Sequence, residues 1–366
     1  MVFTRRIAAK LLAWLGFATM LSACAVDGGV NAANASETET ESESGSESES
    51  ESESESESES ESETETGPPP PWRWESLAPL PEAIQENAVV AEGPRIWVLG
   101  GFQGFVAVAK TFVFDRDVGT WSTGPALSRA LHHVNAAFAA DRLLVLGALE
   151  GLTFTATRDA WALDPTAATP TWEPVTAIDP ARARGAAAVA TIDGNVYVLG
   201  GFRSGAVRMA DVYDAHADRW SPLPDLPAAR DHVVAGAIAG KVYVVGGRDS
   251  SIEAVVPDLW VLDPATQAGW VAMAALPTAR GGAAAAVVAG RLIVMGGEGN
   301  VGLTTGVFPQ VEAYDPVRDV WEALPNMLTP RHGTAAVGVG DAAWVPGGAT
   351  VQAFGSVATF ERLVAN

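Results

Sequence analysis

The stretch Val242-Tyr243-Val244-Val245-Gly246-Gly247 decides the fold of this chain. β-Branched and aromatic residues in a short run that ends in glycine are typical of a β-strand. Apolar side chains occupy alternate and intervening positions alike, so both faces of this strand are expected to be covered. The two glycines permit positive φ angles, which allows a tight exit from the strand beside a neighbouring backbone.

The same short apolar run recurs six times in the chain. The copies are Ile96–Gly101, Leu143–Ala148, Val196–Gly201, Val242–Gly247, Leu292–Gly297 and Ala343–Gly348. Their first glycines are 47, 53, 46, 50 and 51 residues apart, which is enough for four short strands and their turns. Recurrence at a nearly constant period indicates one structural unit repeated six times. The second copy departs from the pattern because Ala148 replaces the second glycine.

Three further markers recur in register with the glycine pair. An apolar residue followed by an acid occurs at Phe114-Asp115, Leu163-Asp164, Tyr213-Asp214, Leu262-Asp263, Tyr314-Asp315 and Phe360-Glu361. A tryptophan then follows at Trp121, Trp172, Trp220, Trp270 and Trp321. An arginine precedes the next small-residue strand at Arg129, Arg184, Arg230, Arg280 and Arg331.

This pattern resembles the kelch repeat, with its glycine pair, Tyr-Asp and spaced tryptophan, and the resemblance covers residues 72–363. It implies an all-β fold, a single six-bladed β-propeller of the kelch type. The last repeat has no tryptophan, but the segment Trp74–Pro81 repeats the Trp/Leu/Leu/Pro spacing of Trp220–Pro227. Residues near 72–77 are therefore expected to form the outer strand of the last blade. This strand would close the ring and leave no open sheet edge at the seam.

Residues 1–24 have the features of a secretory signal peptide. A basic head precedes the apolar stretch Leu11–Ala23, which is too short to span a bilayer. The stretch ends in Leu21-Ser22-Ala23-Cys24, which resembles the bacterial lipobox and implies lipidation of Cys24. Cys24 is the single cysteine of the chain, so no internal disulfide is expected. In lipoproteins, a residue such as Ala25 in place of Asp favours the outer membrane or the cell surface.

Residues 25–71 are predicted to be a disordered tether. Glutamate alternates with serine or threonine from Glu37 to Glu65, and a proline run follows at Pro68–Pro71. Such a segment has almost nothing apolar to bury, and repulsion between like charges favours extended conformations. The rest of the chain, without the signal peptide and the tether, has 20 basic and 29 acidic residues, a net charge of −9. This charge disfavours nucleic acid as a partner.

Strand direction places two sets of loops on one face of the predicted propeller. These are the loop after each glycine pair and the loop that leads into each inner strand. The side chains that we nominate for this rim are Arg129, Arg184, Arg203, Arg230, Arg248, Arg280, Glu298, Arg331 and His332. The arginines suit either pairing between blades or bidentate recognition of a carboxylate or acidic sugar. The histidines lack metal-ligand spacing, so neither a metal site nor a cofactor is predicted.

The sequence favours a non-enzymatic binding module for an unknown protein or glycan at the bacterial cell envelope, and we expect a monomer. One alternative is a carbohydrate-active enzyme such as a sialic-acid-type mutarotase, with Glu298 beside Arg248, Arg280 or His332 as its acid/base group. Another is a purely structural envelope protein. The resemblance also extends to galactose oxidase, but its copper-radical chemistry needs a cross-linked cysteine, and Cys24 lies outside the propeller. No catalytic residue is nominated.

Overall fold

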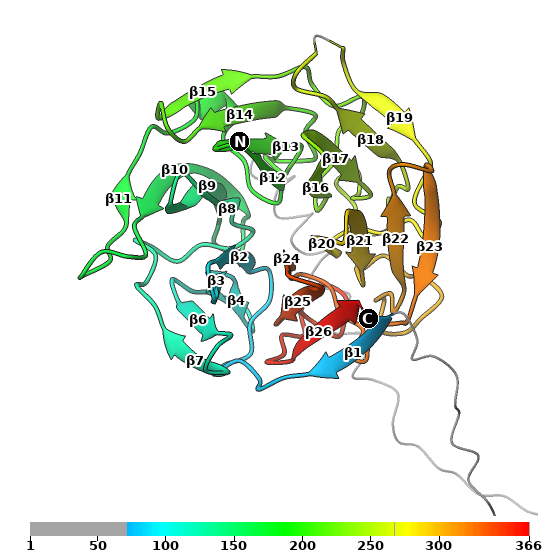
Figure 1. The fold of residues 1–366 in the computed structure, drawn as a ribbon, viewed down its shortest axis with the longest axis horizontal. Helices are drawn as coiled ribbons and strands as arrows, with labels where there is room; N and C mark the ends of the chain where they lie inside the picture. The colour runs from blue at the N-terminus through cyan, green and yellow to red at the C-terminus, as the bar shows by residue number, and fades with distance from the viewer. Residues whose placement is uncertain (1–71, 267, 366) are drawn as a thin grey trace, which may run out of the picture. The chain divides into compact units, whose positions relative to one another are not determined.

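The computed structural model describes residues 72–266 and 268–365, and these residues form six four-stranded antiparallel sheets arranged as blades around a central axis (Figure 1). The predicted signal peptide, tether and Cys24 lie outside the described residues. The first three blades, from the inner to the outer strand, are β2 (Ala88–Glu92), β3 (Arg95–Leu99), β6 (Thr111–Asp115) and β7 (Thr120–Thr123); β8 (Ala136–Ala139), β9 (Arg142–Glu150), β10 (Thr155–Leu163) and β11 (Glu173–Pro174); and β12 (Ala188–Ile192), β13 (Asn195–Leu199), β14 (Ala210–Asp214) and β15 (Arg219–Pro222).

The remaining blades continue around the ring in the same order. They are β16 (Val234–Ile238), β17 (Lys241–Val245), β18 (Leu259–Leu262) and β19 (Val271–Met273); β20 (Ala284–Val288), β21 (Arg291–Met295), β22 (Val311–Asp315) and β23 (Val320–Leu324); and β24 (Val337–Val339), β25 (Ala342–Pro346), β26 (Phe360–Ala365) and β1 (Trp72–Ser76). A two-stranded hairpin, β4 (Phe102–Gln103) with β5 (Val106–Ala107), and a 3₁₀ turn, η2 (Pro180–Arg182), lie in connecting loops. Among the described residues no helix is long and apolar enough to cross a membrane.

The hydrophobic core lies between neighbouring blades. Strand β17 shows why, because its side chains alternate between two clusters. Val242 and Val244 pack toward the third blade, and Tyr243 and Val245 pack toward the fifth. All four are buried, as expected for a strand that carries apolar residues on both faces. Dispersion contacts and hydrophobic burial therefore hold the ring together blade by blade.

The tryptophans of the repeat join each blade to its neighbour. Each indole Nε1–H donates a hydrogen bond to a backbone carbonyl of the preceding blade or of the linker after it. The pairs are Trp74–Pro325, Trp121–Ala78, Trp172–Pro125, Trp220–Thr176, Trp270–Pro224 and Trp321–Ala274, at 2.8–3.2 Å. Trp74 completes the set, so the structure supplies for the last blade the tryptophan that its own repeat lacks.

The ring closes as the sequence predicted. Strand β1 pairs antiparallel with β26 over five residue pairs, from Trp72 with Ala365 to Ser76 with Glu361, and the two strands lie side by side in Figure 1. Trp72 is buried against the fifth blade. The last blade is therefore built from both ends of the propeller.

Blade two departs from the other blades where its sequence does. Because Ala148 replaces the second glycine, β9 and β10 run on as nine-residue strands joined by a short turn. A register shift between Thr157 and Ala160 absorbs the extra length. In the regular blades the second glycine must lack a side chain: at Gly247, where φ is +90°, a Cβ would lie 2.8 Å from the Asp231 carbonyl oxygen.

Candidate functional site

The two predicted sets of loops do meet on one face. Isolated antiparallel bridges join the segment before each inner strand to the segment after each glycine pair. They pair Gln85 with Phe102, His132 with Leu149, Gly185 with Phe202, Asp231 with Arg248, Gly281 with Glu298, and His332 with Ala349. We call this side of the propeller the loop face, and the opening of the central channel on it the mouth.

Four of the nominated arginines are structural. Their guanidinium groups are at most 3% exposed and donate to the carbonyls at the end of the second strand of a blade. Each also pairs with a carboxylate on the third strand or just before it. The pairs are Arg184–Asp211 (2.8 Å), Arg230–Asp258 (2.6 Å), Arg280–Glu312 (2.7 Å) and Arg331–Glu361 (2.5 Å). These guanidinium groups therefore stabilise the fold, which is the first of the two roles that the sequence suggested for them.

Arg129 does not occupy the equivalent position, which corrects the repeat alignment by two residues. The carbonyl that accepts from the second glycine belongs to Arg230 in the third blade but to Leu131 in the first. The Arg129 side chain is instead 43% exposed and pairs with Glu150 and Asp159. Arg203 is also exposed, and donates to the Pro180 carbonyl at 3.4 Å.

A ring of six backbone hydrogen bonds surrounds the channel at the mouth. In each blade, a residue two to four positions before the start of the inner strand donates its N–H to the equivalent carbonyl of the preceding blade. The six residues are Glu86, His133, Ala186, His232, Gly282 and Gly333. All have φ between +49° and +61°, the left-handed region that favours glycine. A non-glycine residue there costs about 1–2 kcal/mol, and four of the six residues, Glu86, His133, Ala186 and His232, are not glycine.

Three of the nominated residues meet near this ring. The Arg248 guanidinium pairs with Glu298, and its Nε donates to Asp231 at 2.9 Å. The second carboxylate oxygen of Glu298 lies 3.4 Å from Nδ1 of His332 and accepts from the Ala353 N–H at 3.1 Å. These residues are buried, with Glu298 only 2% exposed. Arg280, which the mutarotase alternative also considered, does not reach Glu298 but pairs with Glu312.

Three histidines, a glutamate and an aspartate outside the nominated set complete the group. Nε2 of His133 lies 3.0 Å from Oε2 of Glu86 and 2.9 Å from Nε2 of His232. Nδ1 of His133 lies 2.6 Å from Nδ1 of His132. We call the whole set the mouth cluster: Glu86, His132, His133, Asp231, His232, Arg248, Glu298 and His332. Within it, the donor atoms of Glu86, His133 and His232 lie within 4.8 Å of one another.

Charges in the mouth cluster are held by mutual attraction. Burial raises the pKa of Glu298, but attraction to His332 and Arg248 outweighs it, and the pKa lies below its ordinary value. The pKa of Asp231 also lies below its ordinary value, because the hydrogen bond from His232 and attraction to Arg248 outweigh burial. For Glu86 it is outweighed by His133. All three carboxyls are therefore ionised at neutral pH.

His132 and His232, the two histidines on either side of His133, are neutral. Burial, and then the nearby His133, lower the pKa of His132 to about 3. Burial, and then the charge of Arg248, lower the pKa of His232. Burial lowers the pKa of Arg248, but attraction to Glu298 and Asp231 outweighs burial, and the pKa of Arg248 lies above its ordinary value. The guanidinium is therefore the permanent cation of the cluster.

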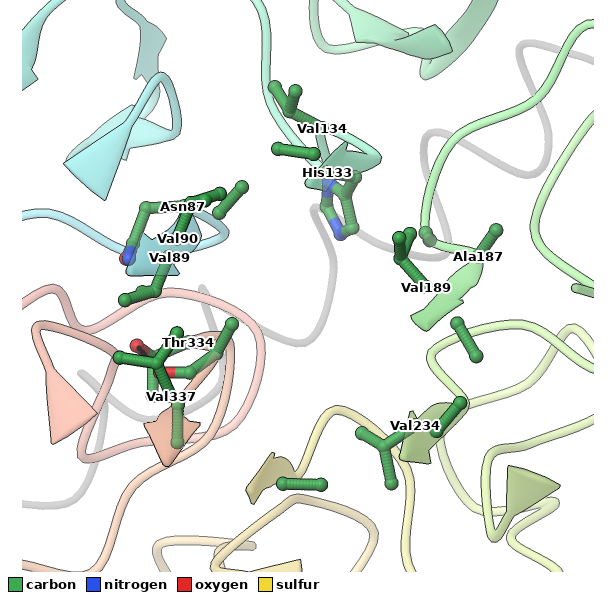
Figure 2. A pocket seen from close by; sticks show the side chains of 18 of the residues that line it. Asn87, Val89, Val90, His133, Val134, Ala187, Val189, Val234, Thr334 and Val337 are labelled. Atoms are coloured by element: carbon green, nitrogen blue, oxygen red, sulfur yellow. Dashed lines mark hydrogen bonds between the residues drawn. The ribbon is translucent and has the colours of Figure 1, made fainter. Parts of the chain in front are cut away.

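The mouth cluster opens into the central channel. A cavity of about 350 Å³ follows the axis and is lined by small apolar side chains of the inner strands, with Glu86, His133 and His232 at one end. Figure 2 shows the imidazole of His133 directed into this space, with Val189 and Val234 along the wall. A Cβ at Gly333 would lie 2.6 Å from Oε1 of Glu86, so glycine there leaves the room that the carboxylate occupies.

Phenylalanines from the loops surround the mouth on the loop face. Phe102 stacks on His132 with ring centroids 4.1 Å apart, and Phe154 lies 5.4 Å from His133. Phe354 contacts Phe102 and Phe105 with centroids 5.6 and 4.6 Å apart. We call Phe102, Phe105, Phe154, Phe202 and Phe354 the aromatic collar.

Similarity to known proteins was found in the repeats and over most of the chain. The Kelch motif family matches residues 183–227, 229–268 and 279–328. Kelch-like protein terF of Aspergillus terreus is 31% identical over 283 residues, which is 73% of this chain and 61% of that protein. Kelch-like protein 35 of Mus musculus is 28% identical over 53% of this chain and 32% of its own length. Kelch-like protein 7 of Rattus norvegicus is 39% identical over 43% and 26%. The chain thus spans less than two thirds of each of these relatives.

Proposed function

Since this chain is a kelch-repeat β-propeller protein, we propose that it is a non-enzymatic interaction module that binds a partner protein through its loop face at the bacterial cell envelope. Kelch-repeat propellers are typically protein-interaction modules. The acid/base alternative is less well supported, because both oxygens of Glu298 are engaged inside the fold and the side chain is 2% exposed.

The observation that carries the proposal is the position of the exposed apolar side chains. Among the described residues, eleven large apolar side chains are exposed, and six of them lie on the loops that follow the glycine pair. They are Phe105 (62% exposed), Val106 (65%), Leu152 (51%), Val301 (83%), Leu303 (49%) and Val351 (45%). Apolar side chains that gather on one face of a soluble protein mark interaction sites, and aromatic residues are enriched in protein interfaces.

The partner is proposed to be a protein because the aromatic collar adjoins these exposed side chains. Phe105 belongs to both sets, and its ring lies against Phe354. Exposed apolar side chains beside aromatic anchors suit the centre of a protein interface.

The test is co-purification from the host cells with the tagged full chain. The change is Phe105→Ser, Val301→Ser and Leu303→Ser together, which removes apolar area from the loop face without touching buried residues. A protein that co-purifies in constant ratio with the unaltered chain is expected to be lost, since truncating a hot-spot residue costs about 2 kcal/mol or more.

The matched control changes exposed apolar residues on the opposite face. Val118 and Val317 are 69% and 93% exposed in the turns between third and fourth strands. The Arg116 N–H donates to the Pro94 carbonyl, which places such a turn beside the one between first and second strands, away from the loop face. Val118→Ser with Val317→Ser should retain the partner. Retention by the loop-face variant, or equal loss by both, would contradict the proposal, and recovery of a glycan instead of a protein would move the partner to that class.

Display at the envelope is proposed from the first 24 residues, because a lipid on Cys24 would hold the propeller to a membrane through the predicted tether. In metabolic labelling with a fatty-acid analogue, the unaltered chain should be labelled and fractionate with membranes. Cys24→Ala should lose the label and move to the soluble fraction, because stable membrane attachment depends on the acyl chains. Unlabelled wild-type chain, or membrane attachment that survives Cys24→Ala, would remove this part of the proposal.

A further inference from the structure

The hydrogen bonds of the mouth cluster orient three of its histidines. Nε2 of His132 faces the Gly151 carbonyl at 3.0 Å, so this nitrogen must donate. The other nitrogen of His132, Nδ1, lies 2.6 Å from Nδ1 of His133, so one of these two atoms donates to the other. Nδ1 of His232 donates to the Asp231 carboxylate at 2.5 Å. Neighbouring groups therefore hold His133 and His232 through Nδ1, and the two rings face each other with their Nε2 atoms.

Three potential ligand atoms then converge at one point. Nε2 of His133 faces Nε2 of His232 at 2.9 Å and the carboxylate of Glu86 at 3.0 Å. Nε2 of His232 also lies 3.0 Å from Nη2 of Arg248. Nitrogen and carboxylate lone pairs at these distances repel one another unless a proton or a cation lies between them. A proton on Nε2 of His133 is one such partner, and a metal ion that binds all three atoms is another.

The charge of the mouth cluster favours a divalent cation. Asp231 and Glu298 are buried carboxylates, and the side chain of Glu86 is only 11% exposed. Among the described residues, Arg248 is the guanidinium that pairs with Asp231 and Glu298, and the other buried arginines pair with different acids. Even with a proton on His332, whose Nδ1 lies 3.4 Å from Glu298, the three carboxylates outnumber these two cations. A buried charge without a partner costs several kcal/mol, and a divalent ion would offset the remaining negative charge.

We propose that Glu86, His133 and His232 bind a divalent transition-metal ion, with Zn²⁺ the best-fitting member of the class, at the mouth of the propeller. Two imidazole nitrogens and one carboxylate oxygen are the donor set of many zinc sites, and three protein ligands leave one position open. Zn–N and Zn–O bonds are about 2.0–2.2 Å long, so neighbouring ligand atoms of a tetrahedral ion lie about 3.4 Å apart. Nε2 of His133 lies 2.9 Å from Nε2 of His232 and 3.0 Å from Oε2 of Glu86. The side chains would therefore have to separate by only about 0.4 Å to admit the ion.

The surroundings of the three ligands resemble those of a built metal site. Asp231 holds the His232 ring through Nδ1, as carboxylates hold zinc-binding histidines, and His132 holds His133 in the same way. The Nη2 of Arg248 lies 3.0 Å from Nε2 of His232, so the ion would replace this hydrogen bond while Arg248 keeps its two carboxylate partners. The open position would face the channel cavity, which ends at Glu86 and the two histidines.

The backbone gives independent support. All three ligands belong to the ring of left-handed residues, where Gly282 and Gly333 show the unstrained choice. Glu86, His133 and His232 have long side chains that converge on one point, although a positive φ angle strains the backbone at each of these residues. Strain of this kind clusters at ligand-binding and active sites. The inference goes beyond the proposed interaction module and does not depend on it.

The test is zinc binding by the purified full chain, measured by competition with a chromophoric chelator after removal of bound metal. One saturable site per chain is expected. His133→Gly should weaken that site about 100-fold or more, because even loss of an outer-shell partner costs 10- to 100-fold. Asp231→Asn, which alters only the group that orients His232, should fall within that smaller range. Substitution by Co²⁺ should give the visible absorption bands of a nitrogen- and oxygen-ligated ion.

The variants are chosen so that folding does not obscure the result. Glycine at position 133 copies Gly282 and Gly333, so His133→Gly and, as a second variant, Glu86→Gly should fold with melting temperatures close to that of the unaltered chain. His216→Ala, which removes the exposed histidine outside the mouth cluster, should bind zinc normally. Weak binding to the glutamates of residues 37–65 is common to all variants and cancels. The proposal would be overturned if the unaltered chain showed no saturable zinc site. It would also be overturned if His133→Gly and Glu86→Gly bound zinc as tightly as the unaltered chain, because a proton alone would then fill the position.

Discussion

Deletion of residues 68–80 from the full chain is expected to lower the melting temperature by roughly 10 °C or more. The deletion removes β1, which forms five residue pairs with β26, and it removes the buried side chains of Trp72 and Leu80. Loss of a buried tryptophan side chain alone costs about 3–5 kcal/mol. It also breaks the hydrogen bond from Trp74 to the Pro325 carbonyl, which joins the last blade to the fifth. Differential scanning calorimetry measures the effect.

The deleted protein should also self-associate, because β26 would become an uncovered sheet edge. A synthetic peptide of residues 68–80, added in excess, should restore part of the lost stability and suppress the association. Deletion of residues 53–65 from the predicted tether removes a segment of the same length, serves as the control and should leave the melting temperature unchanged. If the 68–80 deletion melts like the unaltered chain, β1 does not close the ring.

Arg331→Met is expected to destabilise the propeller by about 3–5 kcal/mol, whereas Arg129→Met should cost less than about 1 kcal/mol. The Arg331 side chain is fully buried, pairs with Glu361 at 2.5 Å and donates to the Val345 carbonyl at 2.8 Å. Its removal leaves the buried Glu361 carboxylate without its cation, with only the hydrogen bond from the Thr329 hydroxyl. Arg129 is 43% exposed, and water can replace it. Urea unfolding of the two variants measures the difference.

A double variant separates the effect of losing the whole ion pair from the effect of leaving Glu361 buried without Arg331. Replacing Glu361 as well, in Arg331→Met with Glu361→Met, removes the stranded carboxylate and should recover much of the stability. Equal stabilities for Arg129→Met and Arg331→Met would contradict the structural assignment. In that case the buried arginines would have to be reconsidered as ligand-binding groups.

The fold could be predicted almost entirely from the sequence because its signals are local and repeated six times. The run Val242–Gly247 indicated a strand covered on both faces, and the structure divides its side chains between two blade interfaces. The spacing of Trp74–Pro81 predicted the closing strand, which is confirmed by the pairing of Trp72 with Ala365. In both cases the same residue types recur at the same spacing in other blades, so their role in one blade predicts their role in the next.

The candidate site could be predicted only in part because its residues come from different blades. Arg248, Glu298 and His332 were nominated for their loops, and the structure brings them together. Glu86 and His133 were missed because the residues that they meet in the site come from other blades, far away in the sequence. The missing signal was the backbone: both occupy the repeat position that is glycine at 282 and 333, and only the correct register shows this. Arg129 was misplaced for the same reason, because Leu131 holds the equivalent position.

Site-specific photo-crosslinking in the host cells tests the proposed function most directly. A photoreactive residue would replace Phe105 or Leu152 on the loop face, and Val118 on the opposite face, each side chain being more than half exposed. The proposal predicts one discrete protein adduct from both loop-face positions and none from Val118. Adducts of equal yield from the two faces, or none from the loop face, would contradict the proposal that the loop face is where this propeller binds its partner.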